Sequence, residues 1–293
     1  MKIGASLRST YMPPDVRTGA RWMVERARAA AAAGLDSLFV GDHHAVPVPY
    51  YQNVAIMGRL LAEWDSRPAG VLMLLPLWQP VLAAEQIGTL ASIAQGPFIL
   101  QCAVGGGDAQ FAAMGASMRD RGARFESTLE TVRRLCAGEV VDGVKIAPVP
   151  PEPLQVWVGA SAPKAVDRAA RVADAFLIGP EATPAQIDDL VRMYRNARAT
   201  HDRDEGVVAV RRDIHVGKDD DDAQRVAGPV IDAGYRGFDP SAPIVGGPET
   251  VARAFKALKE KGCTEVVVRH LAEDQSEVLL SYERLATVKQ LLA

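Results

Sequence analysis

The amino-acid sequence predicts an α/β fold, a (β/α)8 TIM barrel that forms a single domain over residues 1–293. Short apolar runs alternate with helical patterns, and strands separated in this way by helices pair in parallel. About eight such strand–helix units can be counted, which is the number that closes a barrel. The first turn, residues 6–14, has no GxGxxG motif, and that motif is typical of the rival fold, a doubly wound open sheet.

Each expected strand is a short run of mostly apolar residues, and only the seventh is long, with polar residues alternating along it. In chain order the expected strands are Lys2–Leu7, Ser37–Gly41, Ala69–Leu75, Phe98–Val104, Gln155–Val158, Ala175–Ile178, Val207–Val216 and Glu265–Leu271.

Each expected helix has apolar residues at helical spacing. The first ends before Gly34, which occupies the C′ position where glycine stops a helix, and the fifth opens with Pro163, which suits the first helical position. In chain order the expected helices are residues 20–31, Asn53–Trp64, Val81–Ala94, Arg121–Ala137, Pro163–Val172, Pro184–Ala199, Pro248–Lys261 and Gln275–Leu292.

Two segments depart from this alternation. The four acids of Asp219–Asp222 indicate a solvated loop or a helix N-terminus, where negative charge suits the helix dipole. Residues 229–247 are rich in glycine and proline and predict an irregular excursion, which is either a lid or a plain surface insertion.

Composition and charge narrow the class of protein. An apolar fraction of 48% supports a sizeable core, and a net charge of −3 with interspersed signs argues against a nucleic-acid or anionic-membrane surface. The three cysteines, Cys102, Cys136 and Cys263, lack metal-type spacing and are expected to be free thiols. The most apolar run, residues 71–78, is broken by Pro76 and is too short to cross a bilayer. We expect a cytoplasmic protein.

The stretch SLFVGDHH, residues 37–44, ends a buried strand with one acid and two imidazoles. In a barrel the carboxyl ends of the strands form one rim, where reactive groups gather. Acid–base chemistry or cofactor contact by Asp42, His43 and His44 is the favoured interpretation, and capping of loop carbonyls is the structural alternative. A metal site is not expected, because the chain has five histidines and none on its first strand.

Three glycine-containing turns are further candidates. Gly70 lies at a strand start, where glycine marks a bulge or a close approach of a ligand or backbone. Residues 104–108, Val-Gly-Gly-Gly-Asp, remove Cβ bulk where a flat or anionic group fits, or else form a flexible turn. Residues 159–161, Gly-Ala-Ser, precede a helix that begins near Pro163, and Lys164 adds a cation, so a phosphate cradle or a serine-capped helix is expected there.

These motifs, in this order, resemble the luciferase-like family, which includes bacterial luciferase, two-component flavin monooxygenases and deazaflavin-dependent oxidoreductases. The resemblance rests on four stretches. GDHH is similar to the family motif at the end of strand two, and the others are residues 70–107, residues 154–179 and residues 243–269. One departure is Leu77-Trp78-Gln79, where relatives often carry a basic residue.

The resemblance implies a barrel that binds the 8-hydroxy-5-deazaflavin coenzyme F420, or alternatively FMN, at the C-terminal rim. Asp42 and His43 match the pair that contacts the ring and serves hydride chemistry, and Gly70-Val71 matches the position of a non-prolyl cis peptide that backs the ring. The expected cofactor-binding residues are Asp42, His43, Gly70, Val71, Val104, Gly105, Gly106, Gly159, Ala160, Ser161 and Lys164. The expected substrate-side residues are Asp108, Phe111 and Trp78.

The function expected from these residues is deazaflavin-dependent hydride transfer to or from a small organic substrate. His43 is the expected proton-transfer group, and Asp42 orients the same region. An FMN-dependent monooxygenase served by a separate reductase is the first alternative, and a flavin-binding barrel without turnover is the second. The alanine-rich segment Ala27–Ala33 permits close helix packing, so a homodimer is also expected.

Overall fold

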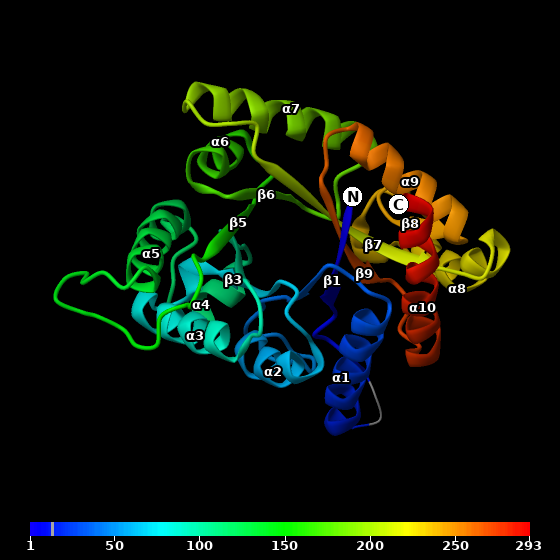
Figure 1. Ribbon diagram of the computed structural model, residues 1–293, viewed down its shortest axis with the longest axis horizontal. Coiled ribbons are helices and arrows are strands. Elements are labelled where there is room, and N and C mark those ends of the chain that lie inside the picture. Colours follow the sequence, from blue (N-terminus) through cyan, green and yellow to red (C-terminus); the bar gives the residue numbers. More distant parts are fainter. Residues whose placement is uncertain (13–14) are drawn as a thin grey trace. The chain divides into compact units, whose positions relative to one another are not determined.

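The computed structural model describes residues 1–12 and 15–293. Within them, nine strands form one sheet in the order β6-β5-β4-β3-β2-β1-β9-β7-β8, and β6 also pairs with β7. Eight strands therefore close into a ring, which confirms the (β/α)8 barrel and excludes the open sheet. Figure 1 labels the strands, which are β1 (Lys2–Leu7), β2 (Ser37–Val40), β3 (Ala69–Leu74), β4 (Phe98–Ala103), β5 (Gln155–Gly159), β6 (Ala175–Ile178), β7 (Val207–Val216), β8 (Ile244–Gly246) and β9 (Glu265–His270).

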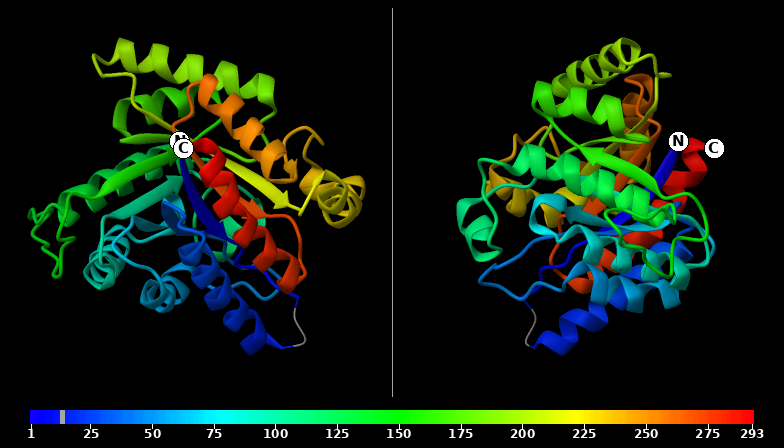
Figure 2. Two further views of the ribbon diagram at one scale, coloured as in Figure 1. Left: turned by 45° about the vertical axis from the view of Figure 1, so that its right-hand side comes forward. Right: turned by 90° about the vertical axis from the view of Figure 1, so that its left-hand side faces the viewer.

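The helices alternate with the strands, and Figure 2 shows them from two further sides. The predicted helices are all present, with ends shifted by a few residues. Two further helices, α4 and α8, are present whose bounds were not predicted from the sequence. The helices are α1 (Val16–Ala32), α2 (Asn53–Leu60), α3 (Pro80–Ile93), α4 (Asp108–Ala113), α5 (Arg121–Cys136), α6 (Pro163–Val172), α7 (Pro184–Thr200), α8 (Asp220–Asp232), α9 (Pro248–Glu260) and α10 (Gln275–Leu292).

The acidic run proves to be a helix N-terminus. Asp219 is the N-cap of α8, and its side chain accepts a 2.8 Å hydrogen bond from the backbone N–H of Asp222. The helix continues through Pro229, so the predicted excursion over residues 229–247 is shorter than expected. Its far end is regular as well, because β8 pairs in parallel with the end of β7. Only residues 233–243 remain irregular, with a 3₁₀ turn at Tyr235–Gly237.

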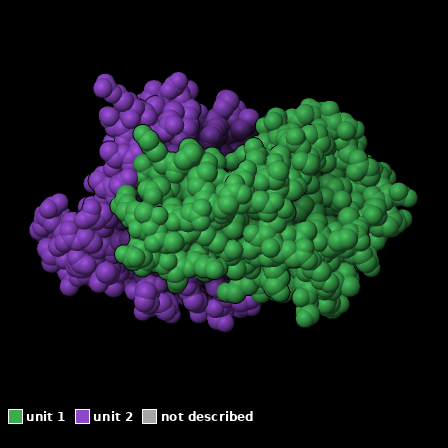
Figure 3. All heavy atoms as spheres, turned by 90° about the horizontal axis from the view of Figure 1, so that it is seen from above, with its two compact units in different colours: residues 1–8, 22–38, 158–293 green, residues 9–21, 39–157 purple. Residues whose placement is uncertain are grey.

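Two compact units divide the chain and are coloured in Figure 3. Unit 1 comprises residues 1–8, 22–38 and 158–293, and unit 2 comprises residues 9–21 and 39–157. The expected cofactor residues up to Gly106 lie in unit 2, and those from Gly159 onward lie in unit 1. The single domain over residues 1–293 stays a prediction.

Each unit buries its strands among apolar side chains. In unit 1, Val208, Val210, Val266 and Val268 are completely buried where β7 and β9 pair. None of the helices in the described ranges has the length and apolar character needed to span a membrane.

Candidate active site

Asp42 fixes the carboxyl ends of β2 and β3 to each other. The strand Ser37–Val40 is buried along its whole length, and Asp42, two residues beyond it, is only 6% exposed. Its Oδ2 accepts hydrogen bonds from the backbone N–H of Leu74, at 2.7 Å, and from Nε1 of Trp78, at 2.8 Å. A buried carboxylate needs such donors, and here both are neutral groups from the end of β3.

The second carboxylate oxygen of Asp42 has unused capacity. Oδ1 lies 3.1 Å from Nε2 of His44, but the two atoms do not have hydrogen-bond geometry. Both atoms are buried and have no hydrogen-bond partner. Buried polar atoms without partners are uncommon and costly, so an acceptor and an imidazole nitrogen at the same point indicate a place for a polar ligand group.

Gln110 holds His44 in this position. The backbone N–H of His44 donates to Oε1 of Gln110 at 2.7 Å, and Nε2 of Gln110 donates to the carbonyl of Gly106 at 3.0 Å. The loop after β2 is thereby joined to the glycine turn after β4. Gln110 is missing from the sequence-based site, because nothing in its sequence neighbourhood distinguishes it from a surface glutamine.

His43 occupies a different environment from His44. His43 is exposed, and the centroid of its ring lies 6.0 Å from that of the Tyr50 ring. Partial burial lowers the pKa of His43 below its usual value of 6.5; the charge of Asp42 opposes this effect and His44 adds to it. His43 is therefore a neutral imidazole at pH 7 that a ligand can reach, whereas the Nε2 of His44 is enclosed.

The glycine turn after β4 has room beside it. Gly105 and Gly107 have positive φ values of 67° and 97°, and a Cβ placed on Gly106 or Gly107 would meet no atom within 4 Å. Asp108 is exposed at the first position of α4. The turn therefore combines a backbone that only glycine adopts easily with open space.

Phe111 does not fit its expected substrate-side role. It is 1% exposed and packs in a hydrophobic cluster with Leu74 and Leu77. Trp78 packs against this cluster and remains partly exposed. Phe111 therefore supports Trp78 from within the core, since one face of the short helix α4 must bury an apolar side chain.

Gly70 makes the close backbone approach that the sequence allowed, but the expected cis peptide between Gly70 and Val71 is absent. Both are buried within β3, where they pair with Ile99 and Leu100, and the peptide between them is not cis. A Cβ on Gly70 would lie 2.0 Å from the carbonyl oxygen of Ile99, so glycine is required by the neighbouring strand. Leu74, four residues and about 13 Å further along the strand, is the β3 residue at the level of Asp42.

The expected phosphate turn lies in unit 1. Gly159 ends β5, and both Ser161 and Lys164 are exposed where α6 begins. The N-cap residue is Ala162, and no side chain caps this helix, so the serine-capped alternative is wrong. An exposed, uncapped N-terminus beside a lysine is compatible with a phosphate group.

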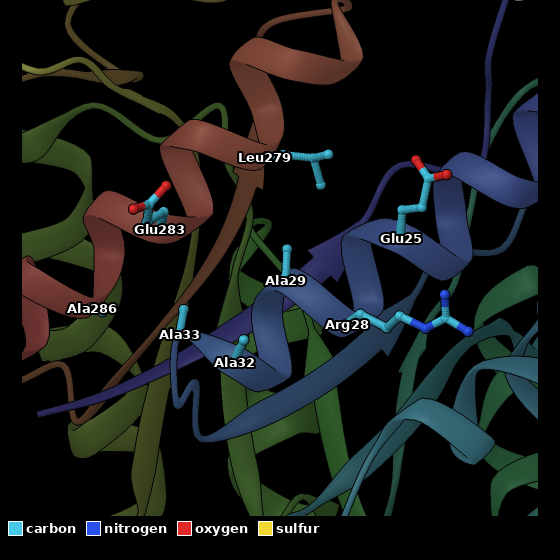
Figure 4. Close-up of a pocket in the computed structure, with 8 residues that line it drawn as sticks. All are labelled: Glu25, Arg28, Ala29, Ala32, Ala33, Leu279, Glu283 and Ala286. Carbon is cyan, nitrogen blue, oxygen red and sulfur yellow. The ribbon is translucent and has the colours of Figure 1, made fainter.

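Two hollows in unit 1 lie in its helix layer and contain none of the expected site residues. The larger, of about 420 Å³, lies between α1 and α10, and Ala29 and Leu279 point toward one another across it (Figure 4). The smaller, of about 290 Å³, is bordered by α7, α9 and the segment before β8. In the described residues no group of three or more His, Cys, Asp or Glu side chains is placed to hold a metal ion.

Comparison with known proteins relates the whole architecture to one family. The model of the luciferase-like monooxygenase family matches residues 1–262. An F420-dependent glucose-6-phosphate dehydrogenase of Nakamurella multipartita is 25% identical over 209 residues, which cover 60% of this chain and 60% of that protein. The solved oxygenating constituent of 3,6-diketocamphane monooxygenase from Pseudomonas putida, in complex with FMN, has a TM-score of 0.84 at 17% identity and covers 100% of this chain and 99% of its own. An F420-dependent secondary alcohol dehydrogenase with an F420-acetone adduct has a TM-score of 0.81 at 16% identity, with coverages of 100% and 99%.

Proposed function

The chain belongs to the luciferase-like monooxygenase family, and from that premise we propose that it is a deazaflavin-dependent oxidoreductase acting on a small organic substrate. Its relatives and structural neighbours include enzymes that depend on F420 and enzymes that use FMN. The observation that carries the proposal is a pair of buried atoms without hydrogen bonds, Oδ1 of Asp42 and Nε2 of His44, which lie 3.1 Å apart just beyond β2.

The residues of unit 2 fit a flat ring with a polar edge. The ring's polar atoms would satisfy Asp42 and His44, and the open side of Gly106 and Gly107 leaves space for a planar group. In unit 1, the uncapped start of α6, with residues 159–161 and Lys164, is proposed to bind a phosphate group. When bound, a deazaflavin supplies hydride chemistry, which side chains alone do not provide.

His43 is the residue proposed to move a proton. It is accessible and neutral at pH 7, so its imidazole can take a proton from a substrate hydroxyl, or return one in the reverse direction. Asp42 and His44 are positioning residues in this proposal: Asp42 holds the end of β3 through Leu74 and Trp78.

An FMN-dependent monooxygenase is the second candidate. It is favoured by the FMN complex that aligns with the entire chain at a TM-score of 0.84. In that case a separate reductase is the proposed partner. A homodimer remains a proposal as well: α1 buries Ala27 and Ala30 but leaves Ala32 exposed beside the hollow of Figure 4.

Titration of the apoprotein with each cofactor tests the proposal. We expect the fluorescence of the deazaflavin to be quenched on binding and FMN to have no effect. Asp42→Asn should weaken deazaflavin binding about tenfold, since a charge-assisted contact is worth about 1.5–3 kcal/mol, while Asp232→Asn on the exposed end of α8 should not. Binding of FMN alone would replace the proposal by the second candidate, and binding without reduction by any hydride donor would indicate a non-catalytic barrel.

A further inference from the structure

A second set of charged residues lies on one face of β7 and β9 in unit 1. In the parallel pairing of these strands Arg211 stands opposite Val267, and Asp213 stands opposite Arg269. Side chains alternate along a strand, so Arg211 and Asp213 share a face, and Arg269 lies on the same face of the neighbouring strand.

This face is the inner face of the barrel. The residue between them, Arg212, points the other way and donates to the carbonyls of Pro180 and Ala182, at 3.2 Å and 2.8 Å. On β9, His270 likewise packs against Tyr282 of α10, with ring centroids 4.1 Å apart. Asp213 and Arg269 are near the carboxyl ends of β7 and β9, and this is the end at which TIM barrels bind substrates.

Asp213 is saturated by its neighbours. Its Oδ1 accepts from Nη2 of Arg211 at 2.9 Å, and its Oδ2 accepts from the hydroxyl of Tyr235 at 2.8 Å and from Nη1 of Arg236 at 3.1 Å. The carboxylate is 1% exposed. It therefore has no capacity left for Arg269, whose Nε is buried without a hydrogen-bond partner.

The positive charges of the cluster outnumber its negative charges. Three guanidinium groups, those of Arg211, Arg236 and Arg269, surround one carboxylate. The cost of this excess is visible at Arg269: burial and the charge of Arg211 lower its pKa to about 10, although Asp213 opposes the shift. An anion bound here would balance the excess positive charge and accept a hydrogen bond from the unused buried donor of Arg269.

The irregular segment after α8 contributes directly to the cluster. Arg236 has φ of 52°, between Gly234 at 80° and Gly237 at 68°. In this conformation its guanidinium reaches Asp213 and also lies 4.6 Å from the ring of Phe238. The segment is thus attached to β7 by Tyr235 and Arg236, and Arg236 remains exposed.

We propose that Arg211, Arg236 and Arg269, organised by Asp213, bind the oxyanion group of the substrate, a carboxylate or a phosphate. Guanidinium forks match the geometry of both groups, and Asp213 prevents the three cations from separating. That the anion belongs to the substrate rests on the proposed function; the binding site itself does not.

Calorimetric titration of the apoprotein at low ionic strength tests the site with acetate alone and with inorganic phosphate alone. We expect at least one of the two anions to bind, and the one that binds more tightly identifies the substrate group. Arg269→Met should weaken this binding about tenfold or more, because it removes a charged hydrogen-bond donor. Arg192→Met, which removes an exposed guanidinium paired only with Asp189 in the same helix, should leave binding unchanged.

Arg236→Gln provides a second variant in an exposed position, should Arg269→Met fail to fold, and it should also weaken anion binding. Equal anion affinity in the wild type and in a folded Arg269→Met or Arg236→Gln protein overturns the site. Anion binding in a protein that binds neither cofactor keeps the site and removes the proposed function. Cofactor binding without any anion binding keeps the proposed function and overturns the anion site.

Discussion

Two buried aspartates, one in each unit, stand at strand ends but have different kinds of partner. Asp42 receives its hydrogen bonds from a backbone amide and an indole, both neutral, and one of its oxygens is left over. Asp213 receives its bonds from two guanidinium groups and a phenol, and both oxygens are used. The difference teaches that equal burial does not mean an equal role: Asp42 can still meet a ligand, whereas Asp213 organises the cations that do.

The pKa of Asp213 reflects this division. Burial alone would raise it, but the charges of Arg211 and Arg269 and the hydrogen bonds from Arg211 and Tyr235 outweigh burial, so the pKa lies below its usual value of 3.8. Asp213 is therefore ionised at neutral pH. Its contribution to stability is complete above pH 3.8 and is lost as the pH falls through the lowered folded-state value.

The sharpest separation of the two regions is expected from His43→Ala. Loss of a general acid–base group costs about 10²–10⁴-fold in kcat, and because His43 is exposed, the fold should be retained. The measurement is turnover with the cofactor that binds, and the control is His201→Ala, a histidine paired with Asp167 outside the site. In the wild type, kcat/KM for substrate oxidation should be maintained at pH 6.5 and fall only at lower pH, because the pKa of His43 is lowered and the neutral base form persists below 6.5. Unchanged turnover in His43→Ala would remove the catalytic role.

Asp213→Asn should give the largest loss of stability. It leaves three guanidinium groups around a neutral side chain, and breaking a buried ion pair from one side costs about 3–5 kcal/mol of unfolding free energy. Urea unfolding followed by circular dichroism measures the change. A loss below about 1 kcal/mol would mean that water solvates the cations and that the cluster is not held by Asp213.

Asp42→Asn should be milder. The amide oxygen can still accept from Leu74 or Trp78, so the expected loss is about 1–3 kcal/mol in the same urea experiment. An equal loss of unfolding free energy in Asp42→Asn and Asp213→Asn would show that neutral and cationic hydrogen-bond partners stabilise these aspartates to the same extent.

The smallest effect is expected on the opposite face of β9, at His270. This imidazole is buried, its two nitrogens lack partners, and burial, followed by the charge of Arg26 and by His215, lowers its pKa well below 6.5. The unfolded chain therefore binds a proton first, and stability should decline as the pH falls below 6.5, by up to about 1.4 kcal/mol per pH unit. His270→Phe should flatten this dependence in urea midpoints between pH 7 and pH 5. An unchanged slope would show that another group, such as His215, is responsible.

Local pattern was sufficient for most of the fold. Each predicted strand ends within one residue of its observed ends, because alternation of apolar runs with 3.6-residue periodicity follows from short-range backbone geometry. The position of Asp42, His43 and His44 beyond the second strand follows from the same pattern. The predicted irregular segment, residues 229–247, is too long, because the helix capped by Asp219 continues through Pro229 to Asp232.

The sequence by itself determined the barrel, the strand-end acid with its two imidazoles, and the resemblance that led to the family. Only the tertiary structure decided that His44 faces Asp42 while His43 stays accessible, that Phe111 is buried, that Gly70 serves a neighbouring strand, and that Arg211, Asp213 and Arg269 share one face. The physical reason is range: periodicity is set by neighbours along the chain, whereas these contacts depend on the register of strands far apart in sequence.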